Sequence, residues 1–119
     1  MLTSAEAQEF ARNWISAWNS HDLEAIVSHY SPDVVLTSPV AARLLNDASG
    51  TVRGKEDLRN YFRRGLEAFP ELSFELLEVL CGLSSVVLYY KNQRGTRTAE
   101  FMEFAADGKV IRVVANYSV

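Results

Sequence analysis

The sequence predicts an α+β fold in which three N-terminal helices pack on one face of a bent, mostly antiparallel sheet. Two observations predict it. Apolar residues recur at helical spacing as far as Pro70, and beyond it they alternate as in a strand. Short turn sequences then separate four apolar segments, which is typical of hairpin-connected antiparallel strands. Helices first and strands last indicate an α+β layout, and 119 residues fit one domain spanning residues 1–119.

The first helix is predicted to begin at Thr3, because Thr3 and Glu6 form a capping-box pattern. The apolar residues that follow have helical spacing and place Trp14 and Trp18 on one stripe. Residues 19–21 break this helix. We therefore expect the two tryptophans to lie on the same face of this helix.

The second helix is predicted to run from Leu23 to Tyr30, with its apolar residues along one face. Pro32 ends it, because a residue that precedes proline is disfavoured in the α conformation. A strand over residues 34–38 follows and stops at Pro39. This order of elements places one strand below two helices and leaves a gap between the strand and the helices, which tends to form a small-molecule pocket.

Residues 40–50 contain turn signals and are expected to form a loop, and residues 51–53 a very short strand. The third helix ends at Pro70 and carries the strongest helical pattern of the chain, made by Leu58, Tyr61, Phe62, Leu66 and Phe69.

Four strands are predicted after Pro70, over residues 72–81, 86–93, 97–104 and 109–119. Cys81 is the one cysteine, so no intrachain disulfide can form. Because it lies in an apolar run with no cationic neighbour in sequence, it is expected to be a buried, unreactive thiol.

Composition narrows the class of partner. The net charge of −3 and the absence of a basic stripe argue against nucleic acid. No polybasic segment, signal sequence or long apolar run indicates a membrane, so a cytoplasmic protein is the default expectation. Two histidines without ligand spacing predict no metal site, and no phosphate-binding glycine loop is present, so no cofactor is expected.

Several motifs in order resemble one family. They are Trp18-Asn19-x-His21-Asp22-Leu23, Tyr30-x-x-Asp33, Ser38-Pro39, Gly54-Lys55-Glu56-x-Leu58 and Asp107-Gly108-Lys109-Val110. Together they are similar to the nuclear transport factor 2-like superfamily, in its SnoaL-like branch. The resemblance implies a cystatin-like cone, in which three helices cover a strongly curved sheet around an internal pocket. It also implies a homodimer formed through the outer sheet face.

Steroid Δ-isomerase is the relative with the clearest chemistry, and the resemblance lets its positions be compared. Its general-base aspartate falls at Ser38, before the Pro-Val pair, and its oxyanion-hole tyrosine falls at Trp14. Its second oxyanion donor falls at or beside Glu100. A serine is a poor base without a neighbour that deprotonates it, and an indole N–H cannot shuttle protons at neutral pH. The isomerase mechanism is therefore not expected in its usual form.

Glu100 is the first candidate catalytic residue. Strand alternation places Glu100, Met102 and Phe104 on one face, and in an apolar cavity the carboxyl pKa would rise by desolvation. Glu100 would then serve as a general acid or a neutral donor. The alternative is a cross-strand ion pair with Arg112 or Arg97.

His29 is the second candidate, as a general base that needs an orienting acid and a route to the pocket. The alternative is a half-buried histidine that hydrogen-bonds a backbone carbonyl near the helix end. Asp22 and Asp33 are better explained by helix-start and turn chemistry.

Two functions remain open. The first is a cofactor-independent proton-transfer enzyme of the isomerase, cyclase or dehydratase type, acting on a small hydrophobic molecule. Glu100 and His29 would be its acid and base, with Ser38 and Trp14 as orienting donors. The second is a non-catalytic module of the same fold that binds a small ligand or forms a dimer. For both, the predicted pocket residues are Trp14, Trp18, Tyr30, Ser38, Tyr61, Phe62 and Met102.

Overall fold

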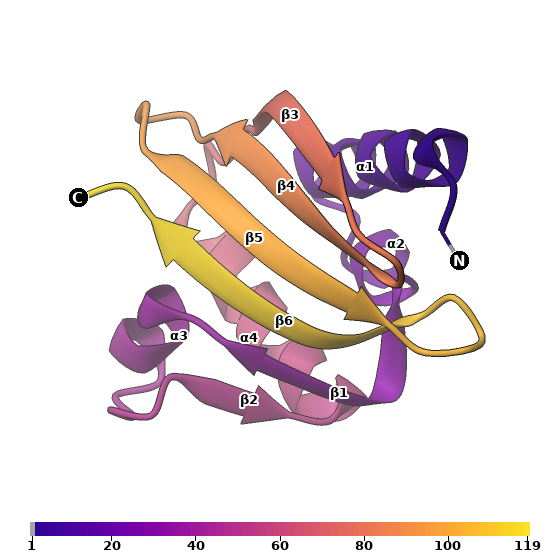
Figure 1. Ribbon diagram of the computed structural model, residues 1–119. Coiled ribbons are helices and arrows are strands. Elements are labelled where there is room, and N and C mark those ends of the chain that lie inside the picture. Colours follow the sequence, from indigo (N-terminus) through magenta and orange to yellow (C-terminus); the bar gives the residue numbers. More distant parts are fainter. Residues whose placement is uncertain (1) are drawn as a thin grey trace.

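The computed structural model describes residues 2–119 as helices packed against one six-stranded sheet (Figure 1). The helices are α1 (Ser4–Asn19), α2 (Leu23–Val27), α3 (Pro39–Leu44) and α4 (Lys55–Ala68). The strands are β1 (Tyr30–Thr37), β2 (Thr51–Arg53), β3 (Glu75–Cys81), β4 (Ser85–Lys91), β5 (Arg97–Phe104) and β6 (Val110–Tyr117). The predicted α+β class is confirmed.

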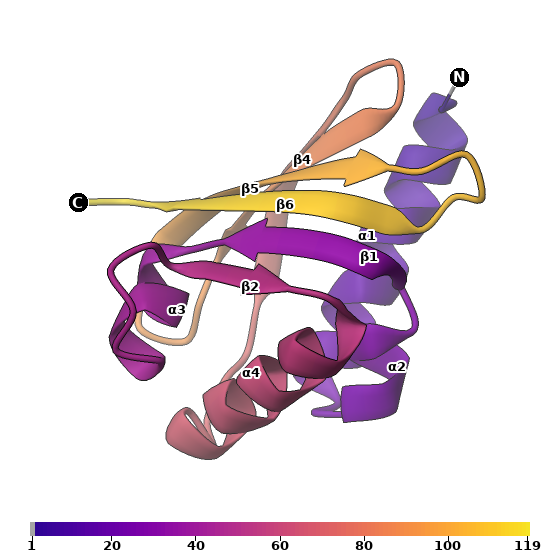
Figure 2. The same ribbon diagram turned by 90° about the horizontal axis from the view of Figure 1, so that it is seen from below.

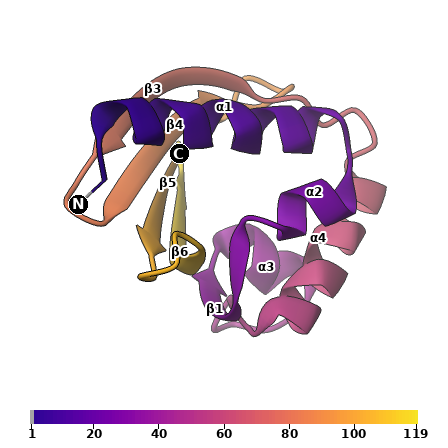
Figure 3. The ribbon, with the colours of Figure 1, turned by 90° about the vertical axis from the view of Figure 1, so that its right-hand side faces the viewer.

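The sheet is mixed, curled and not closed. Its strand order is β2-β1-β6-β5-β4-β3, and only the β1–β6 pair is parallel. Figure 2 shows α2 and α4 on the same side of the sheet, and Figure 3 shows α1 running along the β3 end. The core lies between these helices and the inner sheet face, where the central strands bury alternate residues.

The start of α1 is the predicted capping box. The Glu6 backbone N–H donates to the Thr3 hydroxyl at 3.1 Å, and the Thr3 N–H donates to the Glu6 carboxylate at 2.9 Å. The buried stripe carries Trp14 and Trp18, as predicted.

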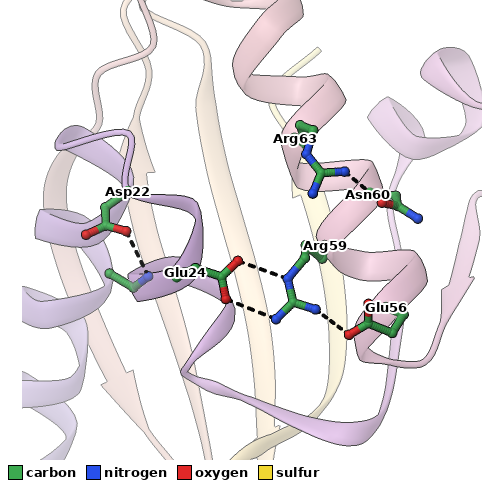
Figure 4. Close-up of polar contacts among 7 residues, drawn as sticks. Asp22, Glu24, Glu56, Arg59, Asn60 and Arg63 are labelled. Atoms are coloured by element: carbon green, nitrogen blue, oxygen red, sulfur yellow. Dashed lines mark hydrogen bonds and ion pairs between the residues drawn. The ribbon is translucent and has the colours of Figure 1, made fainter.

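A charged contact joins α2 to α4. Figure 4 shows the Arg59 guanidinium donating to both carboxylate oxygens of Glu24, at 3.0 and 3.1 Å, and also pairing with Glu56. Asp22 caps α2 by accepting the Ala25 N–H at 3.1 Å. These contacts help to orient the short helix α2 on α4 beside the core.

The predicted end of the second helix is wrong. The helix stops at Val27, and Tyr30 opens β1 instead of lying on the helix. The Ser28 hydroxyl donates to the Ala25 carbonyl at 2.6 Å, and Tyr30 pairs with Val110 of β6. A register shift between Tyr30 and Val35 lets the strand pass through Pro32, which has no N–H to give.

The predicted loop over residues 40–50 is also wrong in part, because α3 occupies its start. Ser38 caps this helix by accepting the Val40 N–H at 3.1 Å, and Pro39 takes the first helical position. The short strand at residues 51–53 and the third predicted helix, now α4, are confirmed.

Four antiparallel-paired strands follow α4 as predicted, with ends that differ by a few residues. Cys81 is exposed, which corrects the expectation of a buried thiol. It ends β3, which is the edge strand of the sheet, and its thiol lies 3.7 Å from the Leu2 carbonyl oxygen. Among the helices of residues 2–119, none combines the length and apolar character needed to cross a membrane.

Candidate functional site

A cavity of about 410 Å³ opens between the inner sheet face and the helices. Its walls come from α1, α3, α4, the inner positions of β4 to β6 and the turn between β4 and β5. Apolar and aromatic side chains form most of the walls, with a few polar groups between them. This composition is typical of small-molecule sites.

Glu100 contributes the one acidic side chain among the described lining residues. It is 6% exposed and accepts a hydrogen bond of 2.6 Å from the Tyr90 hydroxyl. The two residues lie on inner positions of neighbouring strands β5 and β4. The alternative of an ion pair with Arg112 or Arg97 is wrong, since Arg112 pairs with Glu103 on the opposite face at 3.3 Å.

Burial raises the pKa of the Glu100 carboxyl to about 7, and the Tyr90 hydrogen bond opposes part of this rise. The carboxyl therefore exchanges its proton near neutral pH. A group with this property can act as a general base when ionised and as a general acid when protonated.

Further hydroxyls line the same cavity. Tyr61 of α4 and Tyr117 of β6 both lie near Ser38, whose hydroxyl partly offsets the rise in their pKa values. Burial raises the pKa of Tyr117 to about 12 and that of Tyr61 further. Both phenols therefore stay protonated at neutral pH and are hydrogen-bond donors.

The two tryptophans differ in what their N–H groups do. Trp14 Nε1 donates to the Tyr30 hydroxyl at 2.9 Å, so this N–H is committed within the core. Trp18 Nε1 is buried and has no hydrogen-bond partner among the described residues. The expected role of Trp14 as an orienting donor therefore finds no support in the geometry, whereas Trp18 carries a donor without an acceptor.

The structure brings most of the predicted pocket residues together. Trp14, Trp18, Ser38, Tyr61, Phe62 and Glu100 line the cavity. Tyr30 and Met102 are fully buried but lie outside this lining, as core residues. Tyr30 packs on Phe62 at a ring-centroid distance of 5.5 Å, behind the wall.

His29 is not brought to Glu100. It is half-buried outside the cavity lining, and its Nδ1 lies 3.2 Å from the Ile26 carbonyl oxygen. Its ring meets Phe10 edge-on at 5.5 Å, and burial lowers its pKa. This placement matches the structural alternative, with a backbone carbonyl near the helix end as the partner.

Sequence reasoning missed several lining residues, above all Tyr90, Tyr117, Phe74 and Arg43. The alternation of β4 places Tyr90 inward with Val86 and Leu88. The period-2 pattern of this strand in the sequence is therefore a signal that could have identified Tyr90 as a lining residue. Arg43 carries no signal in the sequence, because the turn residues of its segment predict a loop. Within residues 2–119, no group of three or more His, Cys, Asp or Glu side chains is arranged to hold a metal ion.

Comparison with known proteins agrees with this architecture. The model of the SnoaL-like domain family matches residues 11–113. A SnoaL-like protein of unknown function from Burkholderia thailandensis is 39% identical, with a TM-score of 0.94 and coverage of 99% of this chain and 98% of that one. No curated protein matches.

Two more distant structures share the fold. One is a candidate ketosteroid isomerase from Kribbella flavida, 18% identical, with a TM-score of 0.74 and coverage of 95% and 78% of the two chains. The other is SalBIII, an epoxide hydrolase/cyclase-like enzyme in pyran ring formation in the polyether salinomycin, 17% identical, with a TM-score of 0.77 and coverage of 100% and 95%. The chain belongs to the SnoaL-like domain family, and it shares its fold with a nuclear transport factor 2-like protein from Cytophaga hutchinsonii, 12% identical, with a TM-score of 0.70 and coverage of 99% and 92% of the two chains.

Proposed function

We propose that this protein is a cofactor-independent enzyme that moves a proton between two carbon positions of a small, carbonyl-bearing hydrophobic substrate. One observation carries the proposal: a single carboxyl, Glu100, is buried in an apolar cavity with a pKa of about 7. A perturbed carboxyl inside an enclosed, largely apolar cavity is a typical sign of acid–base chemistry.

The proton steps follow from the residues present. In a substrate whose C=C bond is one carbon away from the carbonyl, ionised Glu100 takes a proton from the carbon between them, and the electron pair of that C–H bond moves to form a conjugated dienolate. Protonated Glu100 then returns the same proton to another carbon of the conjugated system, which restores the carbonyl. The net reaction is an isomerisation that needs no co-reactant.

Hydrogen-bond donors would stabilise the enolate oxygen. The hydroxyl of Tyr117 belongs to the cavity wall and stays protonated at neutral pH. Donors already in place at a developing negative charge lower the barrier. Names of relatives with this fold, a candidate ketosteroid isomerase and an epoxide hydrolase/cyclase-like enzyme, favour acid–base chemistry of the same general kind.

A second candidate function, a non-catalytic ligand-binding module, is favoured by Ser38. Its hydroxyl accepts the Val40 N–H and caps α3, and the residue is 3% exposed. This position has a structural task here, whereas the resemblance to steroid Δ-isomerase places the general base at it. A protein of this second kind would bind the same ligands without exchanging their protons.

The test joins a titration to an exchange assay. Carboxyl-detected NMR is expected to give Glu100 a pKa near 7, and a panel of small cyclic ketones in D₂O is expected to gain deuterium beside the carbonyl. Exchange should rise with pH and level off above about 7, as the base ionises. Glu100→Gln should abolish it.

Glu103→Gln is the matched control, because Glu103 lies on the same strand with its side chain on the outer face. Exchange should be unchanged in this variant. An ordinary carboxylate pKa for Glu100, or wild-type exchange equal to that of Glu100→Gln, would refute the enzyme proposal.

A further inference from the structure

The charges around the cavity are unevenly placed. The described lining contains three charged side chains, Glu100, Arg43 and Arg94. Glu100 is buried at the inner end, whereas both arginines are exposed and mark the mouth. A chain with a net charge of −3 thus presents only positive charged side chains at the entrance of this cavity.

Arg43 has no acceptor of its own within the described part of the chain. It lies in the last turn of α3, and none of the side-chain ion pairs between described residues involves it. Its charge nevertheless acts inward, since it lowers the pKa values of Tyr61 and Tyr117 against the larger effect of burial. An arginine with free donors beside a cavity is suited to a planar anion such as a carboxylate.

Arg94 is held at the same entrance by its turn. The Asn92 side-chain oxygen accepts the backbone N–H groups of Arg94 and Thr96, each at 3.0 Å, which fixes the turn between β4 and β5. The Arg94 guanidinium lies over the Phe69 ring, 5.7 Å from its centroid. Its charge is therefore positioned above an apolar wall.

Gly65 leaves space between these charges and the inner end. It belongs to α4 and lines the cavity, and a Cβ built on it would meet no atom within 4 Å. Glycine inside a helix costs stability relative to alanine. No neighbouring atom would clash with a larger side chain at this position, so packing does not explain the glycine. The cavity wall at Gly65 therefore has room for part of a ligand.

We propose that the natural ligand is an amphipathic anion, with an apolar ring body against the aromatic walls and one carboxylate or similar anionic group held at the mouth by Arg43 and Arg94. This inference rests on the proposed function, because it names the ligand class of the same cavity. The reacting end of such a ligand would lie near Glu100, and its anionic end would lie among the arginines.

Two fluorescent probes with the same ring body test the charge preference. They are 8-anilinonaphthalene-1-sulfonate, an anion, and N-phenyl-1-naphthylamine, which lacks the sulfonate. We expect the wild type to bind the anion about tenfold more tightly than the neutral probe, with a preference that falls as salt rises. The variant Arg43→Gln/Arg94→Gln should bind both probes equally, with the neutral probe unaffected.

Two further variants serve as controls. Arg12→Gln/Arg53→Gln removes the same net charge from exposed sites outside this cavity and should keep the preference. Gly65→Trp fills the space over α4 and should weaken the binding of both probes.

The outcomes separate the two proposals. Equal wild-type affinity for the two probes, or a preference that survives Arg43→Gln/Arg94→Gln, would overturn the anionic ligand class while leaving the proposed function standing. Failure of both probes to bind, or binding that Gly65→Trp does not weaken, would overturn the cavity as a ligand site and the proposed function with it.

Discussion

The contact between Tyr90 and Glu100 shows how a single buried pair sets the chemistry of a site. The carboxyl has one hydrogen-bond donor and little water, so burial outweighs the hydrogen bond in setting its pKa. The pKa of Tyr90 is raised in turn, by its own burial first and by the charge of Glu100 second. The proton that is exchanged near neutral pH is therefore that of the Glu100 carboxyl, whereas Tyr90 keeps its proton and acts as a fixed donor.

Stability should depend on pH through Glu100. Its pKa is about 7 in the native state and near 4.5 when unfolded, so the native state binds more protons between these values. Stability therefore falls as pH rises from about 4.5 to about 7, by an amount on the order of 3 kcal/mol. Glu100→Gln should remove this fall, as measured by urea unfolding across that range.

The comparison with wild type matters because His29 acts in the opposite direction. Its pKa is lowered in the native state, so its contribution rises with pH up to about 6.5. Only the difference between the wild type and Glu100→Gln isolates the carboxyl. Parallel pH profiles for the two proteins would contradict the raised pKa of Glu100.

Tyr90→Phe should move the Glu100 pKa upward from about 7, because the lost hydrogen bond favours the ionised carboxyl. Loss of a partner to a buried polar group should also cost about 1–3 kcal/mol of stability. Carboxyl NMR titration and urea unfolding measure the two effects. Tyr89→Phe, on the outer face of the same strand, is the control and should change neither; a fall in the Glu100 pKa would contradict the assignment.

At the scale of the element, α4 carries both the core and the cavity. Leu58, Tyr61 and Phe62 form its buried face, while Gly65 follows one turn later and faces open space. A helix normally continues its apolar stripe with a larger residue at this spacing. The missing side chain at Gly65 leaves open space in the cavity beside this turn of α4.

Gly65→Ala should therefore stabilise the protein, by about 1 kcal/mol, because alanine is the better helix former and its methyl group meets nothing. The melting temperature should rise by about 4 °C, as thermal unfolding followed by circular dichroism would show. Gly82→Ala provides the contrast, since its Cβ would lie 2.7 Å from the Ser85 hydroxyl. A destabilised Gly65→Ala would mean that the space over α4 is not free.

The elements that could be predicted from the sequence are those with strong local signals. The capping box at Thr3, the stripe of α4 and the alternation of β5 each identify their element without tertiary information. The end of α2 and the helix α3 could not be predicted, because the pairing of Tyr30 with Val110 and the cap at Ser38 override weak local preferences.

The candidate site divides in the same way. Glu100 was predicted from strand phase, because alternation fixes which face a residue takes. The positions of His29 and Arg43 depend on where a turn and a short helix point, which periodicity does not encode. The alternation of inward and outward residues along β5 therefore predicted Glu100 at the inner end of the cavity. The residues at its mouth, such as Arg43, are placed only by tertiary packing.

At the scale of the whole molecule, the outer face of the sheet has an apolar row without a helix over it. Val87, Phe101 and Val114 lie side by side in register on β4, β5 and β6, and each is only half-buried. The Arg112 guanidinium lies 5.3 Å from the centroid of the Phe101 ring. We propose that a second copy of the chain covers this row in a homodimer.

Phe101→Glu should then convert a dimer into a monomer, because it places a charge at the centre of the apolar row. Sedimentation velocity at micromolar concentration measures the change. Leu83→Glu is the control, since Leu83 is exposed in the turn between β3 and β4 and should leave the dimer intact. A wild-type monomer at this concentration would contradict the proposal.

The parallel pairing of β1 with β6 has a consequence for synthesis of the chain. β6 comes after the other five strands of this sheet in the chain, yet it lies inside the sheet between β1 and β5. Until β6 leaves the ribosome, the β1–β2 pair and the β3–β5 hairpins are separate pieces with unpaired edges. Closing such distant contacts is slow compared with forming local ones. We therefore expect an open stage during synthesis in which the residues of the future cavity are exposed to solvent.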